Sequence, residues 1–304
     1  MKPISVSIIP SFYCKTNCPY CYLNELRQDH TTIAIDNIVD RLQDLVNNGY
    51  LITSISLYGG ELSLLDQQYL VELFKTCKQY CNAVGVATNG QNKQIFELCD
   101  QFDVSVLISL NQERPDYKRS LKLIEQNPNC SVGVVVLPSI LNQSSAQFCQ
   151  VFDQLGRDVY LFQYYQADIN SPYKFDNKQY TDWVIDLLQY YHRTGPHNFK
   201  IINEVEWTDH NYNPDEDGFI YIMPNGKYAT TQYVNNLEQY CYFDSLTQWE
   251  HYCSNQQLIR KIQCSTCQYF NQCKAEHLVV YNDQYCSGLQ CIIKFYKNTT
   301  YNSI

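Results

Sequence analysis

Strand-like and helix-like hydrophobic patterns alternate along the first two thirds of the chain. Short apolar runs that end at polar or glycine-containing turns predict strands. Between these runs, apolar positions three and four residues apart predict amphipathic helices, as in the face formed by Ile38, Leu42 and Leu45. The six predicted strands lie within residues 4–9, 52–61, 83–90, 104–111, 130–138 and 159–165.

This alternation predicts parallel βαβ units and an α/β fold. Six units within about 190 residues are too few for a closed eight-fold barrel, so we expect a partial (β/α)6 TIM-like barrel. Polar sequences follow the first four strands: a cysteine loop, then Gly-Gly-Glu, Thr-Asn-Gly and Ser-Leu-Asn. Because the carboxyl ends of parallel strands share one rim, these sequences predict a single site there.

The pattern changes near residue 200. The segment "DGFIYIMPNGKYATT" predicts a β-hairpin with its turn at Pro224-Asn225-Gly226. A cysteine-rich stretch, "CSTCQYFNQC", follows with little helical or strand character. We therefore expect a barrel domain over residues 1–200 and a small C-terminal iron–sulfur domain over residues 201–304.

Charge and targeting signals narrow the classes of partner. The formal net charge is −9, the pI is near 5.1, and no basic run stands out, which argues against nucleic acid or an anionic membrane as a partner. The N-terminus lacks the apolar core of a signal peptide, and no apolar run of membrane-spanning length is present. We expect a cytoplasmic protein whose 15 cysteines are metal ligands and buried thiols rather than disulfides.

The cysteine loop after the first strand is the most specific chemical feature. Cys14, Cys18 and Cys21 have the spacing C-x3-C-x2-C, and the next cysteine is Cys77. Structural zinc sites and most [4Fe–4S] clusters take four protein ligands. Three thiolates would hold three irons of a cubane and leave the fourth open, while a partial zinc site is the alternative.

The spacing, with Tyr20 before the last cysteine, resembles the signature of the radical S-adenosylmethionine (SAM) enzymes. The resemblance implies that SAM chelates the open iron and that an electron from the cluster cleaves SAM to a 5′-deoxyadenosyl radical. That radical abstracts hydrogen from a substrate. The resemblance also implies a flavodoxin- or ferredoxin-type electron donor.

Further motifs extend the resemblance over roughly residues 4–165. Gly59 and Gly60 resemble the glycines that let the backbone approach SAM, and Glu61 resembles the acceptor of its ammonium group. The family's usual Pro is Leu62 here, and Asn111 replaces the usual Asp. The SAM-binding residues that the resemblance implies are Tyr20, Gly59, Gly60, Glu61, Asn89, Ser109, Asn111 and Asn142.

The C-terminal cysteines resemble a reduced SPASM domain, of the Twitch type. Cys264, Cys267 and Cys273 keep the spacing C-x2-C-x5-C, with Cys286 as the implied fourth ligand and Cys291 as its alternative. The resemblance implies one auxiliary [4Fe–4S] cluster, because the ligands of the other SPASM cluster are missing or altered. A structural zinc site is the alternative for these cysteines.

The resemblance favours a peptide substrate, as in maturases of ribosomally made peptides that crosslink, epimerise or oxidise residues. A small-molecule dehydrogenase or decarboxylase of the sugar or aminoglycoside type is the first alternative. A non-catalytic metal-binding protein with this fold is the second. The sequence indicates no general base. The polar residues Glu204, Glu206, Asp209 and His210 are interpreted as a solvated loop.

Overall fold

The chain was analysed as a computed structural model, which describes residues 1–164, 173, 177–204, 218–231, 240–263, 265–269 and 290–298. It forms two compact units. The first contains Met1–Gly133, Glu216–Gln232 and Glu238–Ser254, and the second contains Val134–Asp215, Tyr233–Leu237 and Asn255–Ile304.

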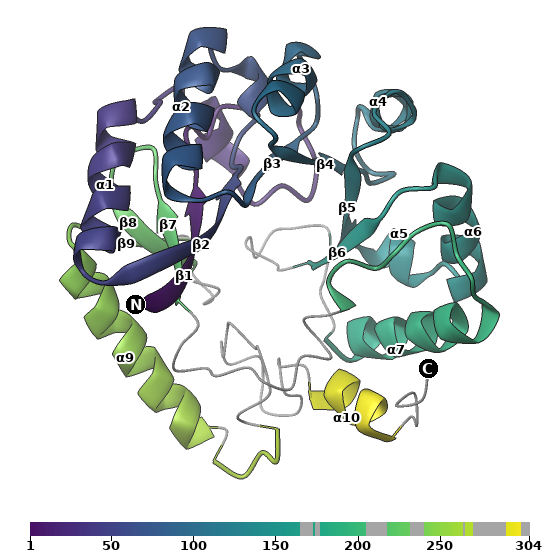
Figure 1. Cartoon of the computed structure of the whole chain (residues 1–304). Helices are drawn as coiled ribbons and strands as arrows, with labels where there is room; N and C mark the ends of the chain where they lie inside the picture. The colour runs from purple at the N-terminus through teal and green to yellow at the C-terminus, as the bar shows by residue number, and fades with distance from the viewer. Residues whose placement is uncertain are drawn as a thin grey trace. The chain divides into compact units, whose positions relative to one another are not determined.

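Parallel strands in chain order form the centre of the first unit (Figure 1). Each strand pairs in parallel with the next one along the chain. The strands are β1 (Lys2–Ile8), β2 (Tyr50–Leu57), β3 (Val84–Thr88), β4 (Ser105–Ser109) and β5 (Ser131–Val136), the last of which continues into the second unit.

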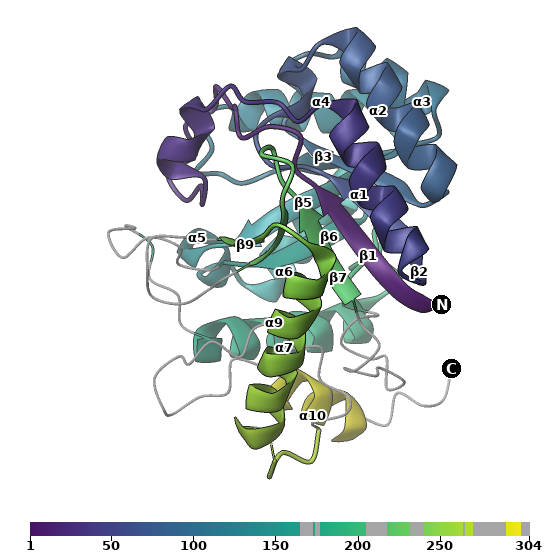
Figure 2. The same ribbon diagram turned by 90° about the vertical axis from the view of Figure 1, so that its left-hand side faces the viewer.

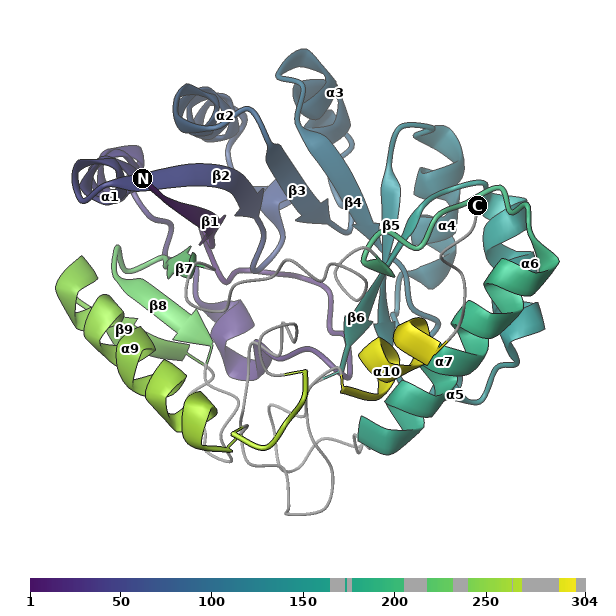
Figure 3. The same cartoon turned by 60° about the horizontal axis from the view of Figure 1, so that its bottom comes forward.

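Helices connect these strands and cover one face of the sheet, as Figures 1 and 3 show for α1, α2 and α3. Each helix buries an apolar stripe; α1, for example, buries Ile38, Leu42 and Leu45. The carboxylate of Asp66 caps α2 by accepting the backbone N–H groups of its first turn. The connecting elements are η1 (Asn24–Gln28), α1 (Ile35–Asn47), η2 (Leu62–Leu64), α2 (Gln67–Tyr80), α3 (Gln94–Gln101) and α4 (Tyr117–Gln126).

The predicted hairpin belongs to this same sheet. Strand β7 (Gly218–Ile222) pairs in parallel with β1 (Figure 2), and β8 (Tyr228–Thr231) and β9 (Tyr240–Phe243) follow in antiparallel order (Figure 3). Helix α9 (Leu246–Gln263) comes next, and neither β9 nor α9 was predicted from the sequence. The division of the chain at residue 200 stays a prediction.

Tyr228 anchors the hairpin to α1. Its side chain is fully buried, and its hydroxyl lies 2.8 Å from Asp44 Oδ2 and 2.9 Å from the Arg41 carbonyl oxygen. Burial and the Asp44 carboxylate raise the pKa of the Tyr228 phenol, so the hydroxyl stays a donor. The Arg41 guanidinium lies over the Tyr228 ring and donates to the Gly226 carbonyl oxygen at 2.7 Å.

The second unit contains a sixth strand and a set of helices. Strand β6 (Val159–Gln163) lies next to β5 in the sheet, and Asn203 both accepts from the Leu161 N–H and donates to its carbonyl oxygen. Phe148 and Trp183 pack edge to face, with ring centroids 5.4 Å apart. The helices are α5 (Pro138–Leu141), α6 (Ser145–Leu155), α7 (Asn177–Thr194) and α10 (Gln290–Asn298).

The six predicted strands and the helices between them are thus confirmed as an α/β fold with a parallel six-stranded sheet. The hydrophobic pattern suffices here because each strand carries buried apolar positions, which alternate with exposed ones in β2 and are nearly continuous in β5. Within the described part of the chain, no helix combines the length and the apolar character needed to cross a bilayer.

Substituting Tyr228→Phe should lower the free energy of unfolding by about 1–2 kcal/mol, because the Asp44 carboxylate and the Arg41 carbonyl oxygen, both partly buried, lose their donor. Tyr80→Phe is the matched control, since the Tyr80 hydroxyl makes only a 3.4 Å contact at an exposed site. That control should stay within about 0.5 kcal/mol of the wild type. Urea unfolding of both variants measures the difference, and equal midpoints would contradict the anchoring role.

Candidate metal and cofactor site

The three predicted ligands lie on one loop between β1 and η1. The Cys14 N–H donates to the Arg27 carbonyl oxygen at 3.1 Å, and the Cys21 N–H donates to the Cys18 carbonyl oxygen at 3.0 Å. These bonds close the loop on itself. The thiols also interact electrostatically, since a negative charge on any one raises the pKa of another.

The Gly-Gly turn after β2 lies against the start of this loop. The Gly60 N–H donates to the Ser11 carbonyl oxygen at 2.9 Å, and the Glu61 N–H donates to that of Tyr13 at 2.8 Å. A Cβ atom at Gly60 would overlap the Tyr13 carbonyl oxygen, and Gly59 has a φ of +130°. The glycines therefore allow close contact between two backbone segments, which brings the turn next to the cysteine loop.

Glu61 connects the ends of β2 and β3. Its carboxylate is 3% exposed and accepts hydrogen bonds from three groups. They are the Ser63 N–H at 3.0 Å, the Asn89 N–H at 2.7 Å and the Thr88 hydroxyl. A carboxylate offers about four acceptor positions, so one remains for a further donor. These bonds compensate the burial of the Glu61 carboxylate.

Asn89, at the end of β3, reaches the cysteine loop directly. Its side-chain amide donates to Thr16 Oγ1 at 3.1 Å and lies 3.9 Å from Cys14 Sγ. The Gln91 amide donates to the same hydroxyl at 2.6 Å. Thr16 lies between the first two cysteines, so the end of β3 orients this part of the loop.

Tyr20 and Asn111 connect the same loop to the end of β4. The Tyr20 hydroxyl donates to Asn111 Oδ1 at 3.3 Å, and Asn111 is 2% exposed. Ser109 ends β4 opposite Gly133 of β5. The structure thus brings together the four strand ends that the sequence analysis placed on one rim.

Three free cysteines on one partly buried loop provide the donor set of a cluster with three thiolate ligands. Burial raises the pKa of the Cys14 thiol and raises that of Cys18 to about 12. Among the described residues, no three His, Cys, Asp or Glu side chains converge as ligands of a single ion. Cys21 packs against an apolar cluster formed by Ile9, Phe12, Leu23, Tyr221, Met223 and Ala229.

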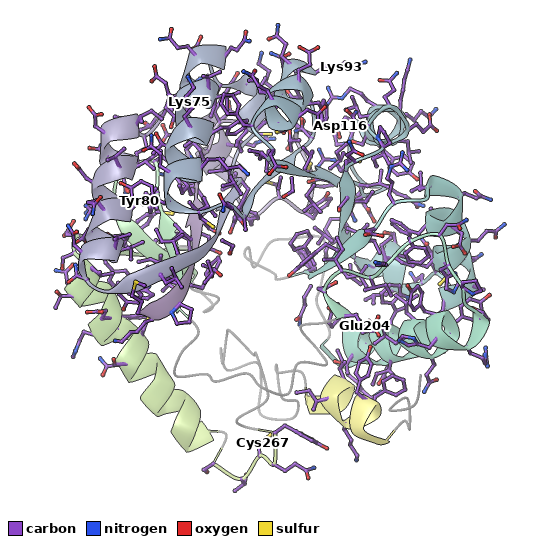
Figure 4. The ribbon with its side chains drawn as sticks, viewed as in Figure 1. Lys75, Tyr80, Lys93, Asp116, Glu204 and Cys267 are labelled. Atoms are coloured by element: carbon purple, nitrogen blue, oxygen red, sulfur yellow. The ribbon has the colours of Figure 1, made fainter. Side chains whose placement is uncertain are left out.

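Three charged residues near the loop were not predicted from the sequence. The buried Arg114 donates from Nε and Nη2 to the Asp116 carboxylate at 3.0 and 3.3 Å. Arg119 Nη2 donates to Asp116 Oδ2 at 2.7 Å, and the Thr16 hydroxyl donates to the same oxygen at 3.5 Å. Figure 4 labels Asp116 just before α4. The sequence could have indicated these residues by their position shortly after the fourth predicted strand, because the ends of parallel strands form the site.

The remaining predicted residues belong to the second unit or are not described. Asn142 ends α5, and Cys267 packs against Tyr269 and Ile293. Cys291 is exposed on α10. Glu204 accepts from the Tyr296 hydroxyl at 2.6 Å and lies 2.5 Å from His192 Nε2, which indicates a structural role (Figure 4). The predicted residues outside the described part are Cys264, Cys273, Cys286, Glu206, Asp209 and His210.

Comparison with protein families supports an iron–sulfur site on the first unit. Residues 9–127 match the family described as a 4Fe-4S single cluster domain. This match includes all three loop cysteines and confirms a [4Fe–4S] cluster in this part of the chain, whereas its assignment to these three ligands stays a prediction. Among curated proteins, none matches the chain by sequence.

Solved structures share the fold at low sequence identity. The anSMEcpe structure with bound AdoMet is 12% identical, has a TM-score of 0.68, and is matched over 97% of this chain and 95% of that one. The anSMEcpe structure with AdoMet and the Cp18Cys peptide has a TM-score of 0.67 over the same shares. SuiB from Streptococcus suis, bound to the precursor peptide SuiA, is 20% identical with a TM-score of 0.53. This match covers 75% of the present chain and only 59% of the SuiB chain.

These likenesses show the fold. The fold is shared with these structures, and residues 9–127 match a 4Fe-4S domain; both findings agree with the resemblance to the radical SAM enzymes identified in the sequence. The auxiliary cluster and the individual SAM-binding residues stay predictions.

Substituting Gly60→Ala should displace the cysteine loop, because the new Cβ meets backbone atoms that cannot move aside. The steric cost should be about 1–3 kcal/mol, and iron and sulfide per reconstituted chain should fall clearly below the wild-type content. In Gly195→Ala, the control, the Cβ would lie at an ordinary 3.6 Å from the Tyr191 carbonyl oxygen. Full cluster content in Gly60→Ala would contradict the close-contact interpretation.

Proposed function

We propose that this chain is a radical SAM enzyme that abstracts hydrogen from a peptide. Cys14, Cys18 and Cys21 would hold a [4Fe–4S] cluster, with SAM bound beside them. When bound, this cofactor pair supplies an electron and a 5′-deoxyadenosyl radical, which removes a hydrogen atom from a substrate C–H bond. The alternative is the same chemistry on a small molecule.

The observation that carries the proposal is the contact network around the three thiols. Backbone bonds from Gly60 and Glu61 join the end of β2 to the segment before Cys14. Asn89 joins the end of β3 to the same loop, and the bond from Tyr20 to Asn111 joins the end of β4. A single zinc ion would need only its ligands, whereas this network also surrounds the ligand loop with polar groups from three further strand ends.

These groups suit the polar part of SAM. Glu61 carries a buried negative charge with one acceptor position left, which could receive an ammonium group. Arg119 is partly exposed and donates to the Asn89 side chain and backbone, so its guanidinium could pair with a carboxylate. Glu61 thus provides an acceptor and Arg119 a donor, and both contact Asn89. Binding of the amino acid part of SAM needs one group of each kind.

Structural relatives that bind peptides support the peptide substrate. SuiB is bound to its precursor peptide SuiA, and anSMEcpe is bound to the Cp18Cys peptide. We further propose one auxiliary [4Fe–4S] cluster on Cys264, Cys267, Cys273 and Cys286. Cys267, the described member of this set, is partly buried beside Tyr269 and Ile293.

The first test is formation of 5′-deoxyadenosine. Anaerobically reconstituted wild-type protein, given SAM and a strong reductant, should form it and should contain about four irons per cubane. Cys18→Ser should abolish its formation, whereas Cys81→Ser should not, because the Cys81 thiol contacts the backbone of Ala83 and lies at the end of α2. Equal product from Cys18→Ser and wild type would contradict the cluster assignment.

A second test identifies the class of substrate. Cells that carry the gene are grown in deuterated medium, and their extract is separated into a peptide and a small-molecule fraction. Each fraction is incubated in ordinary water with the enzyme, SAM and reductant. Deuterium in 5′-deoxyadenosine from the peptide fraction supports the proposal, since carbon-bound deuterium does not exchange with water. Transfer from the small-molecule fraction alone would contradict it in favour of the alternative.

A further inference from the structure

We propose that Arg114 is an electrostatic tuning residue, whose buried positive charge makes the cluster on Cys14, Cys18 and Cys21 easier to reduce. The inference rests on the proposed function, because it requires the cluster. It concerns a residue that the motifs do not include. Arg114 acts through its charge beside the ligand loop and is therefore a positioning residue rather than a catalytic one.

Backbone geometry places Arg114 beside the cysteine loop. Its N–H donates to the Asn111 carbonyl oxygen at 3.1 Å, closing a turn directly after β4. The side chain of the same Asn111 accepts from Tyr20, which directly precedes Cys21. The turn that carries Arg114 is thus joined to the loop through one residue. The Arg114 side chain is only 7% exposed, so its charge is poorly screened by solvent.

Asp116 holds the guanidinium in place. Its two oxygens accept from Nε and Nη2 of Arg114, a bidentate geometry that fixes the guanidinium plane. The Thr16 hydroxyl donates to Oδ2 of the same carboxylate at 3.5 Å. Because Thr16 lies between Cys14 and Cys18, the carboxylate connects the arginine to the ligand loop.

The ion pairs leave an excess of positive charge beside the ligand loop. Two guanidinium groups, those of Arg114 and Arg119, pair with the single Asp116 carboxylate, and that carboxylate accepts from the Thr16 hydroxyl of the loop. An arginine side chain is always charged in proteins. The buried Arg114 guanidinium therefore favours negative charge on the ligand loop.

The same attraction acts on a cluster bound there. Reduction adds one negative charge to the cluster and its thiolates, and a fixed cation nearby stabilises that state. Asp116 acts in the opposite direction, because its negative charge disfavours the added electron. Removing the Arg114 charge should therefore lower the reduction potential, and removing the Asp116 charge should raise it.

The experiment measures the reduction potential of the reconstituted full-length chain by EPR-monitored titration, with iron and sulfide counted for every variant. In Arg114→Gln, we expect the equilibrium constant for reduction to fall at least tenfold, about 59 mV for one electron. Asp116→Asn should shift the potential the other way. Arg114→Lys keeps the charge and should stay closer to wild type than Arg114→Gln. Lys118→Gln removes an exposed positive charge on α4 and should leave the potential unchanged.

Opposite shifts in Arg114→Gln and Asp116→Asn would support the inference, because a loosened loop would move both potentials in the same direction. Unchanged potentials, or shifts of the same sign, would overturn it while leaving the proposed function intact. If Arg114→Gln binds no cluster, Asp116→Asn decides: a potential above that of wild type supports the inference, and an unchanged or lower potential overturns it. A wild-type chain that binds no cluster would overturn the proposed function and this inference together.

Discussion

The close contact between the Gly-Gly turn and the cysteine loop is the constraint on which the site depends. Two backbone hydrogen bonds, from Gly60 to Ser11 and from Glu61 to Tyr13, form because no Cβ stands between the segments. They determine where the loop leaves β1, and with it the place of the first thiol. The same turn directs Glu61 toward the end of β3, so a steric property of glycine sets the position of a buried charge.

Two carboxylates of the site, those of Glu61 and Asp116, each accept several hydrogen bonds from the chain. Glu61 is compensated by neutral donors, whereas Asp116 is compensated by two guanidinium groups and the Thr16 hydroxyl. Neutral donors leave the charge of Glu61 available to a cationic ligand, while the arginines neutralise Asp116 within the chain. The two carboxylates therefore have different roles, although both lie at strand ends that contact the cysteine loop.

The part of the chain beyond residue 200 contributes to the first unit as well as to the second. Strand β7 extends the parallel sheet at β1, and Tyr221 and Met223 join the apolar cluster beside Cys21. Apolar contacts of this kind limit the access of water to a thiol. In the second unit, Glu204 contacts His192 of α7 and Tyr296 of α10, which gives this acidic residue a structural explanation.

The sequence by itself determined the six parallel strands, their helices and the spacing of the loop cysteines, because periodicity and ligand spacing are local properties of the chain. It also placed Glu61, Asn89 and Asn111 on one rim, since the ends of parallel strands must meet there. Only the tertiary structure joined β7 to β1 and brought Arg114 and Asp116 to the cysteine loop. Such contacts join residues about 100 positions or more apart, and they depend on strand register and loop geometry, which hydrophobic pattern does not encode.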